Sequence, residues 1–131
     1  MAENIDNLEE ILKVQKASQE YRGFTFPMQG ANKAAYIKTQ TLHCIDELCE
    51  MLHEVKGYKE WKRYDYYDEF SNKVADTKAT EEFIDALHFF VNIALAFGLS
   101  ADDIFNKYMT KQMVNQARLE DTKEYKKDTE E

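Results

Sequence analysis

The sequence predicts an all-α protein whose four helices form a bundle-like protomer. The 131 residues include one Pro and four Gly, so few residues interrupt helices, whereas good helix formers are abundant. Apolar residues make up 44% of the chain and charged residues 32%, which suits one domain with its own hydrophobic core. We therefore expect a single domain over residues 1–120 and a charged, flexible tail over residues 121–131.

Apolar side chains at helical spacing predict the first two helices. The first runs from about Asn4 to Tyr21. The segment that follows, RGFTFPMQG, contains two Gly and the only Pro of the chain and therefore forms a loop. The second helix runs from about Asn32 to Lys56 and ends at Gly57, since glycine is common just after the last helical residue. The aromatic-rich segment YKEWKRYDYYDEF then connects it to the second half of the chain.

Two further helices occupy that second half. The third runs from about Lys78 to Gly98 and is apolar around almost its whole circumference, as in a buried helix. Ser100 precedes Asp103 by one turn, and this pair is a variant capping box that begins the fourth helix. The fourth helix continues to about Glu120. Four helices with short connections are typical of a bundle.

Charge and cysteine content exclude several classes of function. A formal net charge of −8 disfavours binding to a nucleic-acid backbone, which needs clustered Lys and Arg. Cys44 and Cys49 form neither a disulfide framework nor a CxxC pair, which indicates a reducing compartment. The first residues, MAENIDNLEE, lack the basic and apolar regions of a signal peptide, and no uninterrupted apolar run is long enough to span a membrane. The sequence thus predicts a cytoplasmic protein that binds neither nucleic acid nor a membrane.

Carboxylates line one face of the second helix. Glu47, Glu50 and Glu54 lie within about 60° of one another around the helix axis. Considered alone, they fit the solvated face of an ordinary amphipathic helix. The role of Glu54 stays undecided at this point.

The third helix favours a different interpretation. Its apolar segment EEFIDALHFFVNIALAF is interrupted by a narrow polar strip, formed by Glu81, Glu82, Asp85, His88 and Asn92. Buried carboxylates without partners are unfavourable, so such a strip should face a cation or hydrogen-bonding groups. A purely structural polar seam is the alternative.

Together, the two helices predict a metal site. Glu47 and Glu50 lie one turn apart on one helix, and Glu82 and Asp85 lie one turn apart on the other. If the helices pack antiparallel with these pairs opposed, four carboxylates converge. Carboxylates suit Mg²⁺ or Mn²⁺, and such ions commonly bind phosphates as well, so the implied substrate is a nucleotide or another polyphosphate.

At this point the chain resembles the all-α, MazG-like nucleoside triphosphate pyrophosphatases, most closely the dimeric dUTPase branch found in phages and some bacteria. The resemblance rests on three blocks that cover most of the chain from residue 47 onward: ELCEMLHEVKGYKEWK, EEFIDALHFF and KYMTKQMVNQARLEDTKEY. It implies that Glu47, Glu50, Glu82 and Asp85 hold more than one Mg²⁺. It also implies that water, oriented by Glu47, attacks the α-phosphorus of dUTP to give dUMP and pyrophosphate.

The same resemblance implies a set of phosphate-binding residues. Lys111, Asn115 and Arg118 match family positions and would grip the phosphates of the substrate. Their i, i+4 and i+7 spacing agrees with this role, because it aligns the three side chains along one stripe of the fourth helix. The Arg guanidinium can donate two hydrogen bonds to an oxyanion.

The resemblance further implies residues around the base and sugar. Gln15 resembles the amide that reads the uracil edge, since it offers one donor group and one acceptor group. Trp61 and His88 resemble residues that line the nucleoside pocket, and Lys59 and Tyr125 would close over the substrate. The alternatives are an exposed helix residue for Gln15, core or interface filling for Trp61 and a satisfied core histidine for His88.

The chain departs from the family pattern in two places, one that concerns the cover of the pocket or the dimer contact and one that concerns the base preference. Only Gly98, Leu99 and Ser100 connect the last two helices, and Glu124 stands where the family usually has Gly before the downstream Tyr. Two alternative functions therefore stay open: the same chemistry on another nucleotide such as dCTP, or a non-catalytic helical interaction protein. Apolar surface on the second and third helices predicts a homodimer. The expected location is the cytoplasm, or the host cytoplasm for a phage protein.

Overall fold

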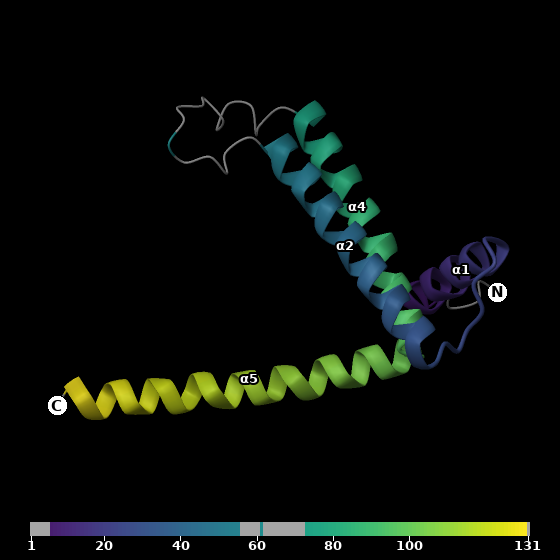
Figure 1. Cartoon of the computed structure of the whole chain (residues 1–131). Helices are drawn as coiled ribbons and strands as arrows, with labels where there is room; N and C mark the ends of the chain where they lie inside the picture. The colour runs from purple at the N-terminus through teal and green to yellow at the C-terminus, as the bar shows by residue number, and fades with distance from the viewer. Residues whose placement is uncertain (1–5, 56–60, 62–72, 131) are drawn as a thin grey trace, which may run out of the picture. The chain divides into compact units, whose positions relative to one another are not determined.

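The described part of the chain is built from α-helices and the loops between them. A computed structural model describes residues 6–55, 61 and 73–130, with side chains described for residues 6–55, 61 and 77–122. Its helices (Figure 1) are α1 (Asn7–Tyr21), α2 (Gly30–Val55), α4 (Lys73–Ala96) and α5 (Ala101–Glu130). No strand occurs among the described residues. The predicted all-α class is therefore confirmed.

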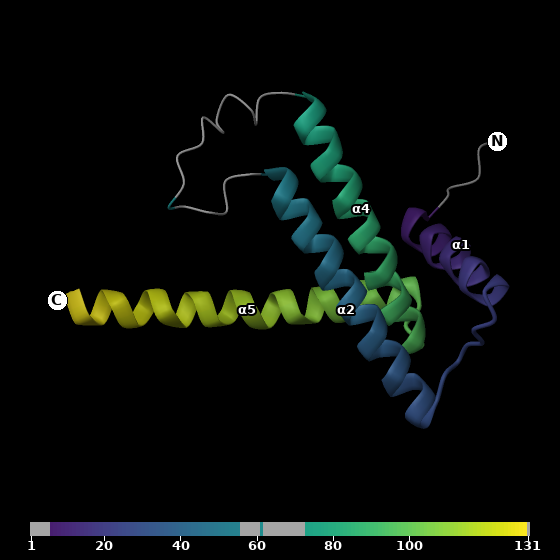
Figure 2. The same cartoon turned by 45° about the horizontal axis from the view of Figure 1, so that its top comes forward.

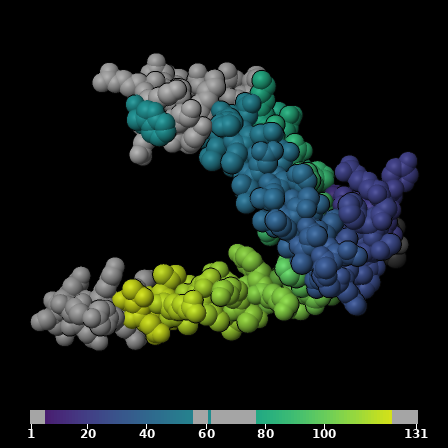
Figure 3. Space-filling view, in the orientation of Figure 1, coloured from purple at the N-terminus to yellow at the C-terminus, as the bar shows by residue number. Residues whose placement is uncertain are grey.

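The chain divides into two compact units, residues 1–98 and residues 99–131. In the first unit α2 and α4 lie side by side along their lengths (Figures 1 and 2), and α1 packs against α4. The two long helices are antiparallel: the Cys44 thiol donates to the Ala86 carbonyl at 3.5 Å, and Gln40, one turn earlier on α2, contacts Asn92 further along α4. In the space-filling view α2 covers much of α4 (Figure 3). The second unit contains α5.

The core of the first unit lies along α4. Its buried apolar residues are Leu12, Tyr36, Ala79, Ala86, Val91, Ala94, Leu95 and Ala96. Four of these are alanines of α4, and small side chains let neighbouring helices approach closely. In the N-terminal part of α2, the Tyr36 ring contacts the rings of Phe24 and Phe26 edge-on, with centroid distances of 5.0 and 5.9 Å. The Tyr36 hydroxyl donates to Gln19 at 2.9 Å and so joins α2 to α1.

Local capping explains where the helices begin and end. Asp6 caps α1, because its side chain accepts a hydrogen bond from the Glu9 amide at 3.1 Å. The predicted capping box at the start of α5 is confirmed: the Asp103 amide donates to the Ser100 hydroxyl oxygen, and the Ser100 amide donates to the Asp103 carboxylate, each at 3.0 Å. Gly98, with φ of 74°, lies just beyond the end of α4 in the left-handed conformation that suits glycine.

The largest differences from the predicted helix boundaries are at the start of α4 and the end of α5. α4 begins at Lys73 rather than near Lys78, and α5 runs to Glu130 rather than ending near Glu120. Neither added segment contains Gly or Pro, and residues 121–130 are rich in Lys and Glu, which favour helices. The flexibility of residues 121–131 stays a prediction, although their backbone is helical up to Glu130.

None of the helices in the described residues is by itself long and apolar enough to cross a membrane. A bent pair, Thr77–Ala96 with Ala101–Thr122, meets the length and composition criteria jointly, as core helices of other proteins also do.

Candidate metal and nucleotide site

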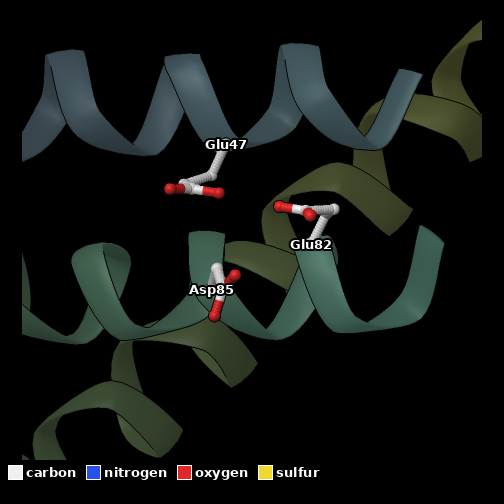
Figure 4. A group of neighbouring side chains, drawn as sticks. All are labelled: Glu47, Glu82 and Asp85. Atoms are coloured by element: carbon white, nitrogen blue, oxygen red, sulfur yellow. The ribbon is translucent and has the colours of Figure 1, made fainter. Parts of the chain in front are cut away.

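Three carboxylates converge between α2 and α4. Glu47 comes from α2, whereas Glu82 and Asp85 come from α4 (Figure 4). One carboxylate oxygen from each lies within 4.8 Å of the others. The antiparallel packing produces this arrangement, because Glu82 and Asp85 lie one helical turn apart on the side of α4 that faces α2.

Glu50 is the fourth acid of the cluster. It lies one turn beyond Glu47 on α2, and it helps to raise the pKa of Glu82, first through hydrogen bonding and also through its negative charge. All four residues that the sequence analysis grouped as metal ligands are therefore neighbours. Their role as ligands stays a prediction. Glu54, the third acid on this face of α2, is half-buried and has no part in the group of three.

The crowding of negative charge raises the pKa values of the cluster. Hydrogen bonds from Glu82 to the carboxylates of Glu47 and Glu50, together with burial and the two negative charges, raise the pKa of Glu82 to about 7. Burial is the main reason that the pKa of Glu47 is raised, and the charges of Glu50 and Asp85 add to it. Glu82 thus keeps its proton up to near-neutral pH when no cation is bound.

A buried oxygen atom of Glu47 shows whether the site suits a cation. Its Oε2 atom is buried and has no hydrogen-bond partner. Within the described residues, no Lys, Arg or His forms an ion pair with Glu47, Glu82 or Asp85. A buried carboxylate oxygen without a partner is unfavourable, and each such group calls for an explanation. A hard divalent cation such as Mg²⁺ or Mn²⁺ fits this all-oxygen donor set.

A second feature is a cavity between α1 and α4. Its volume is about 310 Å³, and Gln15 and His88 are among its lining residues, with Ile11, Val14, Ile84 and Val91 supplying apolar surface. The His88 ring contacts the Ile84 carbonyl through Nδ1 at 2.9 Å, so its Nε2 edge is the one left for another partner. Two residues that the sequence analysis assigned to the nucleoside pocket therefore share one cavity.

Gln15 is not an isolated exposed side chain. Its Nε2 donates to Asn92 Oδ1 at 2.8 Å, and Asn92 Nδ2 donates to Gln40 Oε1 at 2.8 Å. The three amides come from α1, α4 and α2, so this chain of hydrogen bonds joins the three helices that the structure describes in the first unit. Gln40 was not among the residues predicted from the sequence. One signal was available, because Gln40 lies two turns before Glu47 on the same face of α2.

The other predicted substrate residues lie outside the acidic cluster and the cavity or outside the described residues. Trp61 is 74% exposed, so it fills no core formed by the described residues. Lys59 lies outside the described residues, as does the side chain of Tyr125. Lys111, Asn115 and Arg118 lie on α5, and all three are exposed. They belong to the second unit, whereas the acidic cluster and the cavity belong to the first.

Most of the chain is similar to proteins of known families. Residues 7–98 match a family model described as dUTPase. A curated relative, the dCTP pyrophosphatase of Enterobacteria phage LZ5, is 31% identical over 101 residues. That alignment covers 64% of this chain and 58% of the relative, so the chain spans less than two thirds of the relative's length. No solved structure matches the chain significantly.

Proposed function

The chain belongs to the dUTPase family, whose model matches residues 7–98, and we propose that it hydrolyses dUTP to dUMP and pyrophosphate with divalent metal ions as cofactors. The observation that carries the proposal is the group of opposed carboxylates on α2 and α4, in which Glu47 Oε2 is buried without a partner. Such a group is destabilising on its own and becomes favourable when it binds cations.

Glu47, Glu50, Glu82 and Asp85 would hold Mg²⁺, or Mn²⁺ in its place. When bound, the ions would neutralise the triphosphate charge and lower the pKa of water. Glu47 would orient the attacking water by accepting a hydrogen bond from it. Attack on the α-phosphorus breaks the bond to the β-phosphate, so one water is consumed and dUMP and pyrophosphate are released.

Positive and polar side chains complete the substrate contacts in this proposal. Lys111, Asn115 and Arg118 would bind phosphate oxygens, and their exposure leaves them available for this role. Trp61, which is largely exposed, would pack against the nucleoside. Lys59 and Tyr125 would close over the substrate, as the family resemblance implies.

The choice of base has two candidates. The family description favours dUTP, whereas the phage relative is named for dCTP. The cavity beside Gln15 and His88 supports recognition of one pyrimidine base, because an amide offers both a donor and an acceptor. We propose dUTP as the substrate and keep dCTP as the second candidate. An enzyme that removes such nucleotides would act in the cytoplasm, or in the host cytoplasm if a phage encodes it.

The test is pyrophosphate release from a panel of nucleoside triphosphates, with and without Mg²⁺. We expect Mg²⁺-dependent turnover of dUTP that is lost in Glu50→Gln. Glu81→Gln is the matched control, because Glu81 is exposed on α4 and lies outside the acidic cluster. Turnover of dCTP alone would keep the chemistry and reverse the base choice. Silence across the panel would favour a non-catalytic interaction protein instead.

A further inference from the structure

Three amide side chains form a directional chain of hydrogen bonds beneath the cavity. Asn92 is 2% exposed and Gln40 is 7% exposed, so the chain runs through the interior of the first unit. Both hydrogen bonds are 2.8 Å long, and each runs from an amide nitrogen to an amide oxygen: from Gln15 to Asn92 and from Asn92 to Gln40. Only Gln15, at one end of the chain, also lines the cavity with His88.

The direction of the chain determines what Gln15 presents to the cavity. An amide group has two N–H donors on nitrogen and an acceptor oxygen. Because Asn92 donates through Nδ2 to Gln40, its Oδ1 faces Gln15 and can only accept. Gln15 must therefore turn its nitrogen towards Asn92, which leaves its carbonyl oxygen and its second N–H for a ligand. If the Gln40 amide were reversed, the whole chain could reverse, and Gln15 would exchange the positions of its donor and its acceptor.

We propose that Asn92 and Gln40 are positioning residues that fix the orientation of the Gln15 amide and thereby set the preference between uracil and cytosine. This inference rests on the proposed function, in which Gln15 contacts the base. Neither Asn92 nor Gln40 lines the cavity that Gln15 and His88 share. They act on the base through Gln15 alone.

The chemistry of the two bases explains why orientation matters. Uracil presents an N–H donor at N3 beside a carbonyl acceptor at C4. Cytosine presents an acceptor at N3 beside an amino donor at C4, which is the reverse order. In a cavity that holds the ring in one pose, a fixed amide forms hydrogen bonds with one of these edges. With the other base, its donor faces a donor and its acceptor faces an acceptor. Sites built around buried hydrogen bonds discriminate strongly for this reason.

The chain of amides differs from an ordinary bridge between helices. Gln19 forms such a bridge: it is 4% exposed and accepts a hydrogen bond from the Tyr36 hydroxyl, which joins α1 to α2. This pair lies outside the chain that ends at Gln15. It therefore supplies a matched control for the loss of a buried amide that holds helices together.

The test compares two substitutions of Gln40. At a pH high enough to ionise it, the carboxylate of Gln40→Glu can only accept, so it still requires Asn92 to donate and preserves the orientation of Gln15. In Gln40→Met, the acceptor is lost and the Asn92 amide can turn. The readout is the ratio of kcat/KM for dUTP to kcat/KM for dCTP, which a loss of stability alone does not change. Thermal unfolding checks that each variant is folded.

We expect Gln40→Glu to keep the wild-type ratio within about threefold and Gln40→Met to move it towards one by about tenfold, the factor that corresponds to about 1.4 kcal/mol. Gln19→Met should lower the melting temperature and leave the ratio unchanged. If Gln40→Met does not fold, Gln40→Ala replaces it. Gln40 borders a separate cavity of about 720 Å³, so a shortened side chain there admits water, which both donates and accepts and fixes no orientation.

Three outcomes would overturn the proposal: an unchanged ratio in Gln40→Met or its Ala replacement, an equal change in Gln40→Glu, or an equal change in Gln19→Met. A wild-type protein that hydrolyses no nucleotide would count against the proposed function instead. In that case the base preference is measured by calorimetry, as the ratio of the affinities for the α,β-imido analogues of dUTP and dCTP. Binding of neither analogue would overturn both proposals together.

Discussion

Glu47 on α2 and Glu82 on α4 place carboxylate oxygens within 4.8 Å of each other across the interface of two antiparallel helices. When metal is absent, hydrogen bonding to Glu47 and Glu50, burial and the negative charges of these two residues favour the protonated form of Glu82 and raise its pKa. The proton therefore occupies a place that a cation would take at higher pH. This exchange between proton and metal leads to the first two predictions.

Without metal, the protein should lose stability as pH rises from about 4.5 to about 7. The pKa of Glu82 is raised from 4.5 to about 7 in the folded chain, so over this range the folded state binds more protons than the unfolded state. Stability then falls as pH increases, and this contribution becomes constant above the folded pKa. Urea unfolding in EDTA across this range measures the slope. Glu82→Gln should flatten it, whereas Glu81→Gln should not. A slope of the same size in Glu82→Gln would place its origin elsewhere.

Mg²⁺ should stabilise the protein more at pH 8 than at pH 5.5. Protons compete with the metal for Glu82 at the lower pH, and the raised pKa of Glu47 acts in the same direction. A ligand present at 100 times its Kd adds about 2.7 kcal/mol to the free energy of unfolding. We expect a rise in melting temperature of several degrees at pH 8 with saturating Mg²⁺. An equal rise at both pH values, or a rise that persists in Glu82→Gln, would contradict this site.

Glu47→Gln should separate stability from activity. The substitution removes a buried negative charge whose Oε2 atom has no partner, so the metal-free protein should melt at a higher temperature. The same change removes a proposed metal ligand that is also the proposed acceptor for the attacking water, and kcat/KM should fall at least about a hundredfold. Calorimetric melting in EDTA and pyrophosphate release measure the two effects. A variant that is both less stable and fully active would refute the assignment of Glu47.

The acidic cluster could be predicted from the sequence because its pattern is local. Each helix carries two acids one turn apart, and the polar strip of α4 stands out against its apolar neighbours. The capping box at Ser100 and Asp103 is local in the same sense. The role of Gln40 could not be predicted, since its contact with Asn92 depends on the register of α2 against α4, which no single helix encodes. The cavity beside Gln15 likewise depends on where α1 packs against α4. α5 runs beyond its predicted end because Lys and Glu favour helices, although a run of charged residues is also typical of a flexible tail.

The protein is expected to form a homodimer, and we expect α5 to form part of the dimer interface. Large apolar side chains on this helix are exposed, among them Phe105 at 61%, Tyr108 at 66% and Met113 at 71%. Contiguous exposed apolar surface is unfavourable in water and commonly marks an interface. Light scattering at micromolar concentration should give the mass of two chains, and Phe105→Glu with Met113→Glu should shift it towards one.

Lys107→Glu is the matched control. Lys107 is exposed on the same helix, and its substitution adds negative charge without removing apolar surface. It should leave the mass unchanged. If residues of both chains build the substrate site, the double variant should also lose pyrophosphate release at low protein concentration and regain it as concentration rises, as mass action requires. A wild-type monomer that is active at every concentration would contradict the dimer. The residues of α5 would then act in the substrate site of their own chain.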